Sequence, residues 1–380
     1  MSAATAASAK TGRNIVAGDQ VLDTPLIAVD LDLLERNIAE MAALAVSHGV
    51  AMRPHAKTHK SPHIARRQLE AGAVGLTCAK LGEAEVLVDQ GGVTDILIAY
   101  PIVGDIKIQR LLHLLDRARV IVAIDTHRAA AALSQAVSAS DRTLDIYVEV
   151  NTGQDRAGAY AGPDAVDLAV AVSQMPGLRV AGVMTHEGHA GFSSPDDIAT
   201  VAENAGRALV DTAERIRSQG IEVADVSVGS TPASWFTPRV PGITEMRPGT
   251  YVFHDNNAFR HGRIGPDRCA AWVVSTVVSR PAPDRAIIDA GSKALALDPS
   301  PSHPGHGFIV GHPGATIARL SEEHGVVTLL PAESGFDVGH RVEIIPNHIC
   351  PAVNLTDELV VIRNGDVVDR WPVAARGKVR

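Results

Sequence analysis

Residues 50–60 read VAMRPHAKTHK, a short apolar run that ends in a dense group of basic and imidazole side chains. The next stretch, Pro62–Ala71, has the amphipathic spacing of a helix, with proline in its first turn and Gly72 just past its end. A second apolar run, Ala73–Ala79, follows at once. This order of strand, polar loop, helix and strand predicts one unit of an α/β fold.

The same unit recurs along the chain up to about residue 231. Eight apolar runs of strand length alternate with amphipathic stretches, and they are Pro25–Leu31, Val50–Lys57, Ala73–Ala79, Asp95–Pro101, Arg119–Asp125, Leu144–Asn151, Leu178–Gly188 and Val223–Thr231. Eight strand-then-helix units predict a closed (β/α)8 barrel of the TIM type. An open doubly wound sheet is the alternative, but it usually carries a glycine-rich loop after its first strand, and residues 29–32 contain no glycine.

The alternation of strand and helix patterns stops after about residue 250. Apolar runs are separated there by Pro- and Gly-rich turns, with no long helix pattern between them, and they are Ala271–Ser279, Arg285–Asp289, Val326–Leu330, Arg341–Ile345 and Leu359–Arg363. This predicts a second, mostly β domain. We therefore expect residues 1–22 to be an N-terminal tail and a segment near the β domain, residues 23–252 to be the barrel, and residues 253–380 to be the β domain.

Composition narrows the class of protein. The chain has 380 residues with 46% apolar and 3% aromatic content, which suits aliphatic strands packed under Ala-rich helices. Its net charge is −8 and Lys and Arg form no cluster, so we expect no nucleic-acid partner. Three cysteines make no disulfide framework, and neither a signal peptide nor a membrane-spanning run is visible. A cytoplasmic protein with no membrane partner is the expectation.

Polar and ionisable residues concentrate where predicted strands end. The segments at these ends read RPHAKTHK at 53–60, EVNTGQDR at 149–156, THEGH at 185–189 and GSTP at 229–232. In a barrel of parallel strands, the active site lies at the carboxyl ends of the strands. The sequence therefore predicts an active site built from these segments.

Lys57 lies at one of these strand ends, close in sequence to Arg53, His55 and His59. Burial and neighbouring cations both lower the pKa of a lysine, and the resulting neutral amine can form a Schiff base with an aldehyde. The alternative is a solvated loop lysine, which is what most lysines are.

Two further groups of residues indicate ligand chemistry. Gly229-Ser230-Thr231 follows the eighth predicted strand and offers backbone N–H groups and hydroxyls to a phosphate, although an ordinary turn has the same residues. In the β domain, His348 and Cys350 stand two apart on a segment predicted to be extended, so that their side chains point the same way. Imidazole and thiolate suit zinc, and suit manganese or cobalt less well. The alternative is a buried cysteine beside a hydrogen-bonded histidine.

The octapeptide RPHAKTHK resembles the D-threonine aldolase and D-serine dehydratase family. Its members are fold-type III enzymes of pyridoxal 5′-phosphate (PLP), with a barrel related to that of alanine racemase. The likeness covers nearly the whole chain and includes GEAE at 82–85, NTGQDRAG at 151–158, RPGTY at 247–251, DAGSK at 289–293 and HICPAVNL at 348–355. The lysine octapeptide and the late His-x-Cys pair, in this order, are quite specific to the family.

The resemblance implies a cofactor site. Lys57 would bind PLP as a Schiff base, and Arg156 would contact the cofactor ring and its phenolic oxygen. His186 or Glu187 would lie beside the pyridine ring. The phosphate would be held by Gly229, Ser230, Thr231 and Tyr251.

The resemblance also implies a metal and a proton acceptor. His348 and Cys350 would bind a divalent metal (manganese, zinc, cobalt or magnesium) that engages the 3-hydroxyl of the substrate. His59 is a candidate general base near that hydroxyl. Members of the family form homodimers, so we expect a homodimer.

Two lyase reactions remain open, both on a small D-3-hydroxy amino acid. Cys350 is typical of the dehydratases, since the aldolases usually carry aspartate there, whereas residues 351–355 and the run WPVAARG at 371–377 resemble the aldolases. The first choice is a D-threonine aldolase, which cleaves D-threonine to glycine and acetaldehyde. The alternative is a dehydratase of D-serine or D-threo-3-hydroxyaspartate, which releases a 2-oxo acid and ammonia.

Two other classes fit less well. A racemase would need a second base, typically a tyrosine from the β domain, but all the tyrosines precede that domain: Tyr100, Tyr147, Tyr160 and Tyr251. A non-catalytic PLP carrier would normally be a barrel alone, without a metal pair in a second domain.

Overall fold

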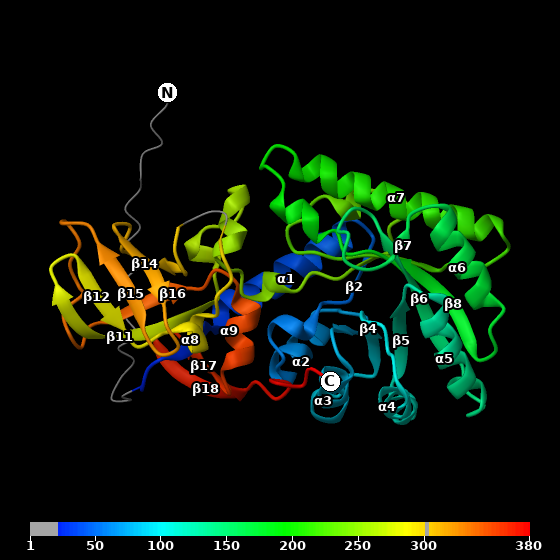
Figure 1. Cartoon of the computed structure of the whole chain (residues 1–380), viewed down its shortest axis with the longest axis horizontal. Coiled ribbons are helices and arrows are strands. Elements are labelled where there is room, and N and C mark those ends of the chain that lie inside the picture. The colour runs from blue at the N-terminus through cyan, green and yellow to red at the C-terminus, as the bar shows by residue number, and fades with distance from the viewer. Residues whose placement is uncertain (1–21, 301–303) are drawn as a thin grey trace. The chain divides into compact units, whose positions relative to one another are not determined.

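The structure, a computed structural model, describes residues 22–300 and 304–380. Within these ranges the chain divides into two units (Figure 1). Glu35–Val252 and Pro372–Arg380 form the first, which we call the barrel unit. The described residues up to Leu34 and Phe253–Trp371 form the second, which we call the β unit.

Parallel strands form the barrel unit. In spatial order they are β2 (Ala51–Met52), β10 (Glu245–Met246), β9 (Asp225–Val228), β8 (Leu178–Met184), β6 (Leu144–Asn151), β5 (Arg119–Ile124), β4 (Asp95–Ile98) and β3 (Leu76–Cys78). The two ends of this order meet, because Met52 O accepts a hydrogen bond from Val74 N–H at 2.9 Å and Pro54 O accepts one from Thr77 N–H at 2.8 Å. The predicted α/β barrel is therefore confirmed.

Helices connect successive strands, as parallel pairing requires. They are α1 (Leu31–Ser47), α2 (Pro62–Glu70), α3 (Leu81–Gly91), α4 (Asp105–Leu115), α5 (His127–Ser138), α6 (Pro163–Ser173) and α7 (Ile198–Ser218). Local chemistry sets several ends. Pro62 opens α2 as expected, and the Thr126 side chain accepts a hydrogen bond from Ala129 N–H to cap α5. Within the described ranges, no helix is long and apolar enough to cross a membrane.

The β unit contains a mixed sheet. Its main path runs β14 (Ala315–Leu320), β15 (Gly325–Leu329), β12 (Arg285–Ile288), β11 (Ala271–Ala282), β1 (Leu26–Asp30), β17 (Glu358–Arg363) and β18 (Asp366–Pro372). Off this path, β16 (Arg341–Ile345) pairs with β11 and with β13 (Phe308–Ile309). Two short helices, α8 (Ser292–Leu295) and α9 (Ile349–Leu355), complete the unit. The predicted mostly β domain is confirmed.

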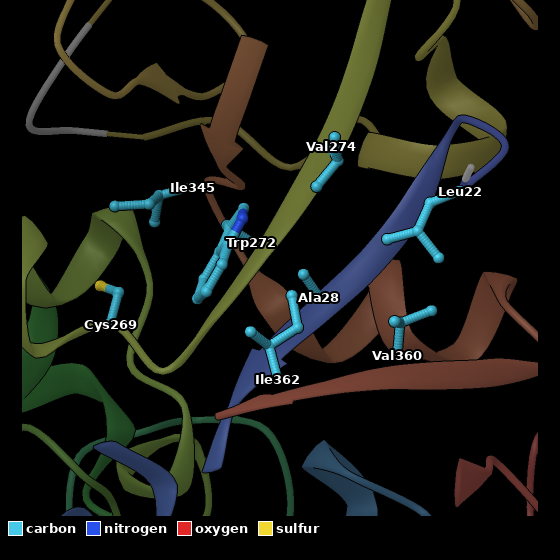
Figure 2. Packing of buried hydrophobic residues seen from close by; sticks show 8 residues of the cluster. All are labelled: Leu22, Ala28, Cys269, Trp272, Val274, Ile345, Val360 and Ile362. Carbon is cyan, nitrogen blue, oxygen red and sulfur yellow. The ribbon is translucent and has the colours of Figure 1, made fainter. Parts of the chain in front are cut away.

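One face of this sheet carries a buried apolar cluster. Alternate residues of a strand share a face, which places Trp272 beside Val274 on β11 and Val360 beside Ile362 on β17. Figure 2 shows Trp272 near the centre of the cluster, which also contains Leu22, Ala28, Cys269 and Ile345.

The first predicted barrel strand belongs to the other sheet. Pro25–Leu31 does contain a strand, β1, but β1 pairs antiparallel with β11 and parallel with β17. The remaining place in the barrel is taken by β10, which pairs with β2 and β9. An apolar run that is buried on both faces looks the same in either sheet, so the pattern could not assign β1. Strand β10 has two residues and lies before Arg247-Pro248, so it has no periodicity to detect.

Candidate active site

A cavity of about 630 Å³ opens at the carboxyl end of the barrel unit. Its lining includes residues within three positions of a strand's carboxyl end: His55 after β2, Ala79 after β3, Ala99 after β4, His186 after β8, Gly229 after β9 and Arg247 after β10. A volume of this size lies in the range of small-ligand pockets. Strand ends that are far apart in the sequence therefore share one cavity, as the barrel rule requires.

Lys57 lines this cavity from a single helical turn, Ala56–Thr58. The turn begins at His55, whose Nδ1 accepts a hydrogen bond from Lys57 N–H at 3.4 Å. Gly249 packs against the turn so closely that a Cβ on it would lie 2.9 Å from Thr58 Oγ1 and 3.1 Å from His55 O. Glycine is thus needed at 249 for the backbone to approach the lysine turn.

Two imidazoles share the cavity with Lys57. Burial, together with the charges of Lys57 and Arg247, holds the pKa of His55 well below its usual range. Burial and the same lysine hold the pKa of His186 well below its usual range too. His186 Nδ1 is hydrogen-bonded to Gly229 O, which assigns the proton to Nδ1 in the neutral ring. Both rings are therefore neutral near pH 7; Nε2 of His186 can accept a hydrogen bond, whereas Nε2 of His55 carries the proton.

The cavity carries more positive than negative charge. Cations from several strand ends line it, while Glu149 is the carboxylate among the lining residues that the structure describes. Burial raises the pKa of Glu149, against the opposing effect of Arg156 and Arg247. This imbalance suits an anionic ligand, because like charges gathered on low-dielectric walls reinforce one another. The cations are Lys57, Lys80, Lys107, Arg156 and Arg247.

The turn after β9 is held by its own side chains. Ser230 Oγ accepts a hydrogen bond from Ala233 N–H at 3.2 Å. Thr231 Oγ1 accepts hydrogen bonds from the N–H groups of Gly249 and Tyr251, both at 3.2 Å. Of the four predicted phosphate residues, Gly229 lines the cavity, and a Cβ there would lie 3.0 Å from Arg247 Cβ.

Glu187 supports this turn from behind. It is 1% exposed, and its Oε2 accepts a hydrogen bond from Gly229 N–H at 2.9 Å. Burial raises the pKa of Glu187. Glu187 is not a lining residue, so the structure places His186, and not Glu187, in the cavity.

His59 and Tyr251 lie behind the cavity wall, joined through Gln68. His59 is fully buried, its Nδ1 accepts a hydrogen bond from Ser61 N–H at 3.1 Å, and its Nε2 lies 3.2 Å from Gln68 Oε1. Gln68 Nε2 in turn donates to Tyr251 Oη at 3.0 Å. Burial lowers the pKa of His59 to about 4. Both nitrogens of His59 are thus engaged within the barrel unit.

The structure also brings in residues that the sequence pattern did not single out. His55, Glu149 and Arg247 all line the cavity. Each lies within a predicted strand end or a family motif, but residue type alone could not rank it above its neighbours. His189 is a further case: its Nδ1 is buried without a hydrogen-bond partner among the described residues, and its Nε2 lies 3.0 Å from where a Cβ on Gly153 would be.

The predicted metal pair lies in the β unit. His348 has extended backbone and precedes α9, whereas Cys350 lies inside the first turn of that helix. The prediction of an extended segment is therefore wrong for Cys350, because the helix begins at Ile349. Burial alone would lower the pKa of His348, but the nearby Cys350 sulfur and the Asp255 carboxylate raise it well above its usual range. The two side chains are close enough to act together.

Asp255 orients His348. Its Oδ2 lies 2.9 Å from His348 Nδ1 and also accepts a hydrogen bond from Ile349 N–H at 3.1 Å. A carboxylate on Nδ1 leaves Nε2 of the imidazole for a metal, which is the usual arrangement around a ligating histidine. Within residues 22–300 and 304–380, no three His, Cys, Asp or Glu side chains are grouped so as to hold an ion. The donor pair fits a metal that takes its other ligands from water or substrate.

The fold agrees with the comparisons with known proteins. Residues 29–257 match the model of the alanine racemase N-terminal domain, and residues 270–362 match that of a serine dehydratase domain. The chain belongs to the D-threonine aldolase and D-serine dehydratase family. Members of this family are fold-type III PLP enzymes, so the family prediction is confirmed, and with it the expected cofactor class.

Relatives within the family carry two kinds of activity. The chain is 36% identical to a D-threonine aldolase of an Arthrobacter species, over 94% of this chain and 93% of the relative. It is 32% identical to a D-threo-3-hydroxyaspartate dehydratase of Delftia sp. (strain HT23), over 87% of this chain and 91% of the relative. A crystal structure of D-threonine aldolase from Filomicrobium marinum superposes with a TM-score of 0.87 at 37% identity, covering 94% of this chain and 96% of that one.

The solved forms of a D-threo-3-hydroxyaspartate dehydratase include two informative mutants. In one, described as metal-free, a cysteine is replaced by alanine. In the other, the residue replaced by alanine is a histidine two positions earlier. This is the spacing of His348 and Cys350.

Proposed function

We propose that the protein is a PLP- and divalent-metal-dependent lyase of D-3-hydroxy amino acids, and that its first reaction is the cleavage of D-threonine to glycine and acetaldehyde. One observation carries this proposal. The chain that places Lys57 in a cavity at the carboxyl end of its barrel is 36% identical to a D-threonine aldolase along nearly its full length. We also expect the family's homodimer.

The barrel unit would hold PLP. Lys57 would be the attachment point, and Arg156 and neutral His186, which line the same cavity, would contact the ring. Gly229 would let the backbone approach the phosphate, and hydrogen bonds of Ser230, Thr231 and Tyr251 hold the shape of that turn. Glu187 fixes the turn through Gly229 N–H. Bound PLP supplies an electron sink for bond cleavage next to the substrate amine.

The β unit would hold the metal through His348 and Cys350, with Asp255 orienting the imidazole. Imidazole and thiolate favour zinc, and manganese, cobalt and magnesium remain candidates. A bound divalent ion lowers the pKa of a coordinated hydroxyl, and here that group would be the substrate 3-hydroxyl.

A base must accept the proton of the 3-hydroxyl in the aldolase reaction. His59 is one candidate, but both its nitrogens already have partners, so it would have to release one to act. His189 is a second candidate, because its Nδ1 has no hydrogen-bond partner within the described ranges. Burial lowers the pKa of His189, which keeps the ring neutral and able to accept a proton.

The dehydratase is the second candidate function, and Cys350 is the observation that favours it. The mutants of the hydroxyaspartate dehydratase involve a histidine and a cysteine with the spacing of His348 and Cys350. In this reaction Lys57 would take the proton from the α-carbon, and the metal would assist departure of the 3-hydroxyl. D-Threonine would then give 2-oxobutyrate and ammonia.

The products of D-threonine separate the two functions. The purified protein is incubated with PLP, manganese or zinc, and D-threonine, and the products are identified by NMR. We expect glycine and acetaldehyde, loss of activity with a chelator, and recovery when the ion is returned. Lys57→Ala should lose both the activity and the visible absorbance of bound PLP, because the amine is the attachment point.

Other products would contradict the aldolase proposal in different ways. 2-Oxobutyrate with ammonia would replace the aldolase by the dehydratase and make the metal pair the better guide to reaction type. No product from D-threonine, with turnover of L-threonine, would overturn the proposed substrate class even if Lys57 binds PLP.

A further inference from the structure

A buried ion pair lies beside the lysine turn. Lys60 Nζ is 2.8 Å from Glu83 Oε1, and the two side chains are 7% and 3% exposed. Removing two charges from water is expensive, and apolar residues of similar size are often as stable as such a pair. The presence of this pair is therefore not explained by stability alone.

Glu83 has a second contact, on the cavity wall. Its Oε2 accepts a hydrogen bond from Ala79 N–H at 2.8 Å, and Ala79 lines the cavity after β3. Glu83 lies in the first turn of α3. One buried carboxylate thus holds the end of β3 with one oxygen and the segment after Lys57 with the other.

Lys60 transmits this restraint to Lys57. Lys60 N–H donates to Ala56 O at 2.8 Å, which closes the turn that contains Lys57. Lys60 has a φ of 50°, a left-handed backbone that is uncommon for a residue with a side chain. Its carbonyl accepts a hydrogen bond from Ala375 N–H at 3.0 Å. The side chain, the backbone N–H and the carbonyl of Lys60 are all fixed by these contacts, so the end of the turn has little freedom to move.

We propose that Glu83 is a positioning residue for Lys57. Through Lys60 and Ala79 it fixes the lysine turn against the end of the neighbouring strand β3, and so sets where the Lys57 amine lies in the cavity. This inference rests on the proposed binding of PLP at Lys57. A purely structural role is the competing explanation, since a glutamate in a first helical turn that bonds back to a preceding N–H also caps the helix.

Three variants separate these explanations. Glu83→Gln keeps an acceptor for Ala79 N–H but leaves Lys60 without its charge partner. The double variant Lys60→Met/Glu83→Met removes both buried charges and replaces them with apolar side chains. Glu85→Gln is the matched control, because Glu85 lies on the same helix and pairs with Arg110 at 2.6 Å, with side chains 28% and 30% exposed.

PLP affinity, the pH at which the absorbance of bound PLP changes, and the melting temperature of the PLP-free protein are measured for each variant. We expect Glu83→Gln and the double variant to weaken PLP binding by about tenfold or more, since small misplacements at a reacting centre are costly. Both should also shift the pH of the absorbance change. The double variant should recover most of the melting temperature without recovering PLP affinity, and Glu85→Gln should match the parent.

Each remaining outcome counts against the inference. Unchanged PLP affinity and absorbance in Glu83→Gln would overturn it. So would recovery of melting temperature and PLP affinity together in the double variant, because the pair would then be structural only. If Glu83→Gln does not fold, the double variant still decides. Retained PLP absorbance in Lys57→Ala would show that Lys57 is not the attachment point. That result would overturn the proposed function, and it differs from the two outcomes that overturn only the role of Glu83.

Discussion

Residue type alone does not say what a histidine does in this protein. His59 is buried with both nitrogens engaged, and burial lowers its pKa to about 4. For His348, the Cys350 sulfur and the Asp255 carboxylate outweigh burial and raise the pKa. His186 is kept neutral by burial and nearby cations. The same imidazole is thus a structural link, a candidate metal ligand or a neutral hydrogen-bonding group, according to its neighbours.

Asp255 gives a test at this scale. We expect Asp255→Asn to weaken metal binding by roughly 10–100-fold, because the carboxylate that orients His348 and raises its basicity is lost. Calorimetric titration of the protein with manganese or zinc measures the change. Asp337→Asn is the matched control, since Asp337 lies 3.9 Å from His340 in an exposed pair. Equal affinity in Asp255→Asn and the parent would show that Asp255 does not orient a metal ligand.

Some predicted site residues can be located from their position in the sequence, whereas the location of others depends on tertiary packing. Lys57, Arg156, His186 and Gly229 follow strands and line the cavity. Position after a strand is visible in the sequence, so these could be proposed in advance. His59, Glu187 and Tyr251 lie behind the wall, which depends on side-chain direction and on partners such as Gln68 and Gly229. Their predicted roles remain predictions.

At the scale of elements, buried charges link different strands of the barrel. Arg53 directly follows β2, and its guanidinium contacts carboxylates on the first residues of β10 and β4. Arg53 Nε donates to Glu245 Oε2 at 2.7 Å, and Arg53 Nη1 contacts Asp95 Oδ1 at 2.5 Å. These contacts link β2, β10 and β4, so they hold together the part of the ring where the strands are shortest.

Breaking this link should destabilise the barrel. Glu245→Gln removes one of the two carboxylates that contact the buried Arg53 guanidinium and leaves Asp95. The cost should be at most the roughly 3–5 kcal/mol that is typical of removing one partner of a buried pair. Urea unfolding of the PLP-free protein gives the value. The control Glu40→Gln removes an exposed pair with Arg36, at 2.8 Å, and should change the free energy of unfolding by at most about 0.5 kcal/mol. Similar effects of the two substitutions would contradict a closing role for Arg53 and Glu245.

At the scale of the whole molecule, buried neutral histidines make stability depend on pH. The folded-state pKa of His59 is about 4, below the ordinary value of 6.5, so the unfolded chain binds its proton first as the pH falls. The stabilisation is therefore complete above about pH 6.5 and is lost progressively between pH 6.5 and 4. For His59 this amounts to about 3 kcal/mol. His55 and His186 act in the same direction.

Replacing His59 should flatten this dependence. The free energy of unfolding is measured at several values between pH 4 and 7 for the parent and for His59→Gln. We expect the slope to fall by up to about 1.4 kcal/mol per pH unit, the contribution of one proton. His113→Gln, at an exposed position, should leave the slope unchanged. An identical slope in His59→Gln and the parent would mean that His59 is not buried in the neutral form.

The sequence by itself determined the fold class and the family, and it singled out Lys57, which lines the cavity, as the candidate cofactor lysine. Helix and strand periodicity depends on residues that are close in the sequence, so it predicts where the barrel strands end. The tertiary structure alone decided which sheet receives β1, that β10 completes the barrel, and which polar side chains meet. Glu245 lies 192 positions from Arg53, and Asp255 lies 93 positions from His348. Such pairings depend on how whole elements pack, so no local sequence pattern predicts them.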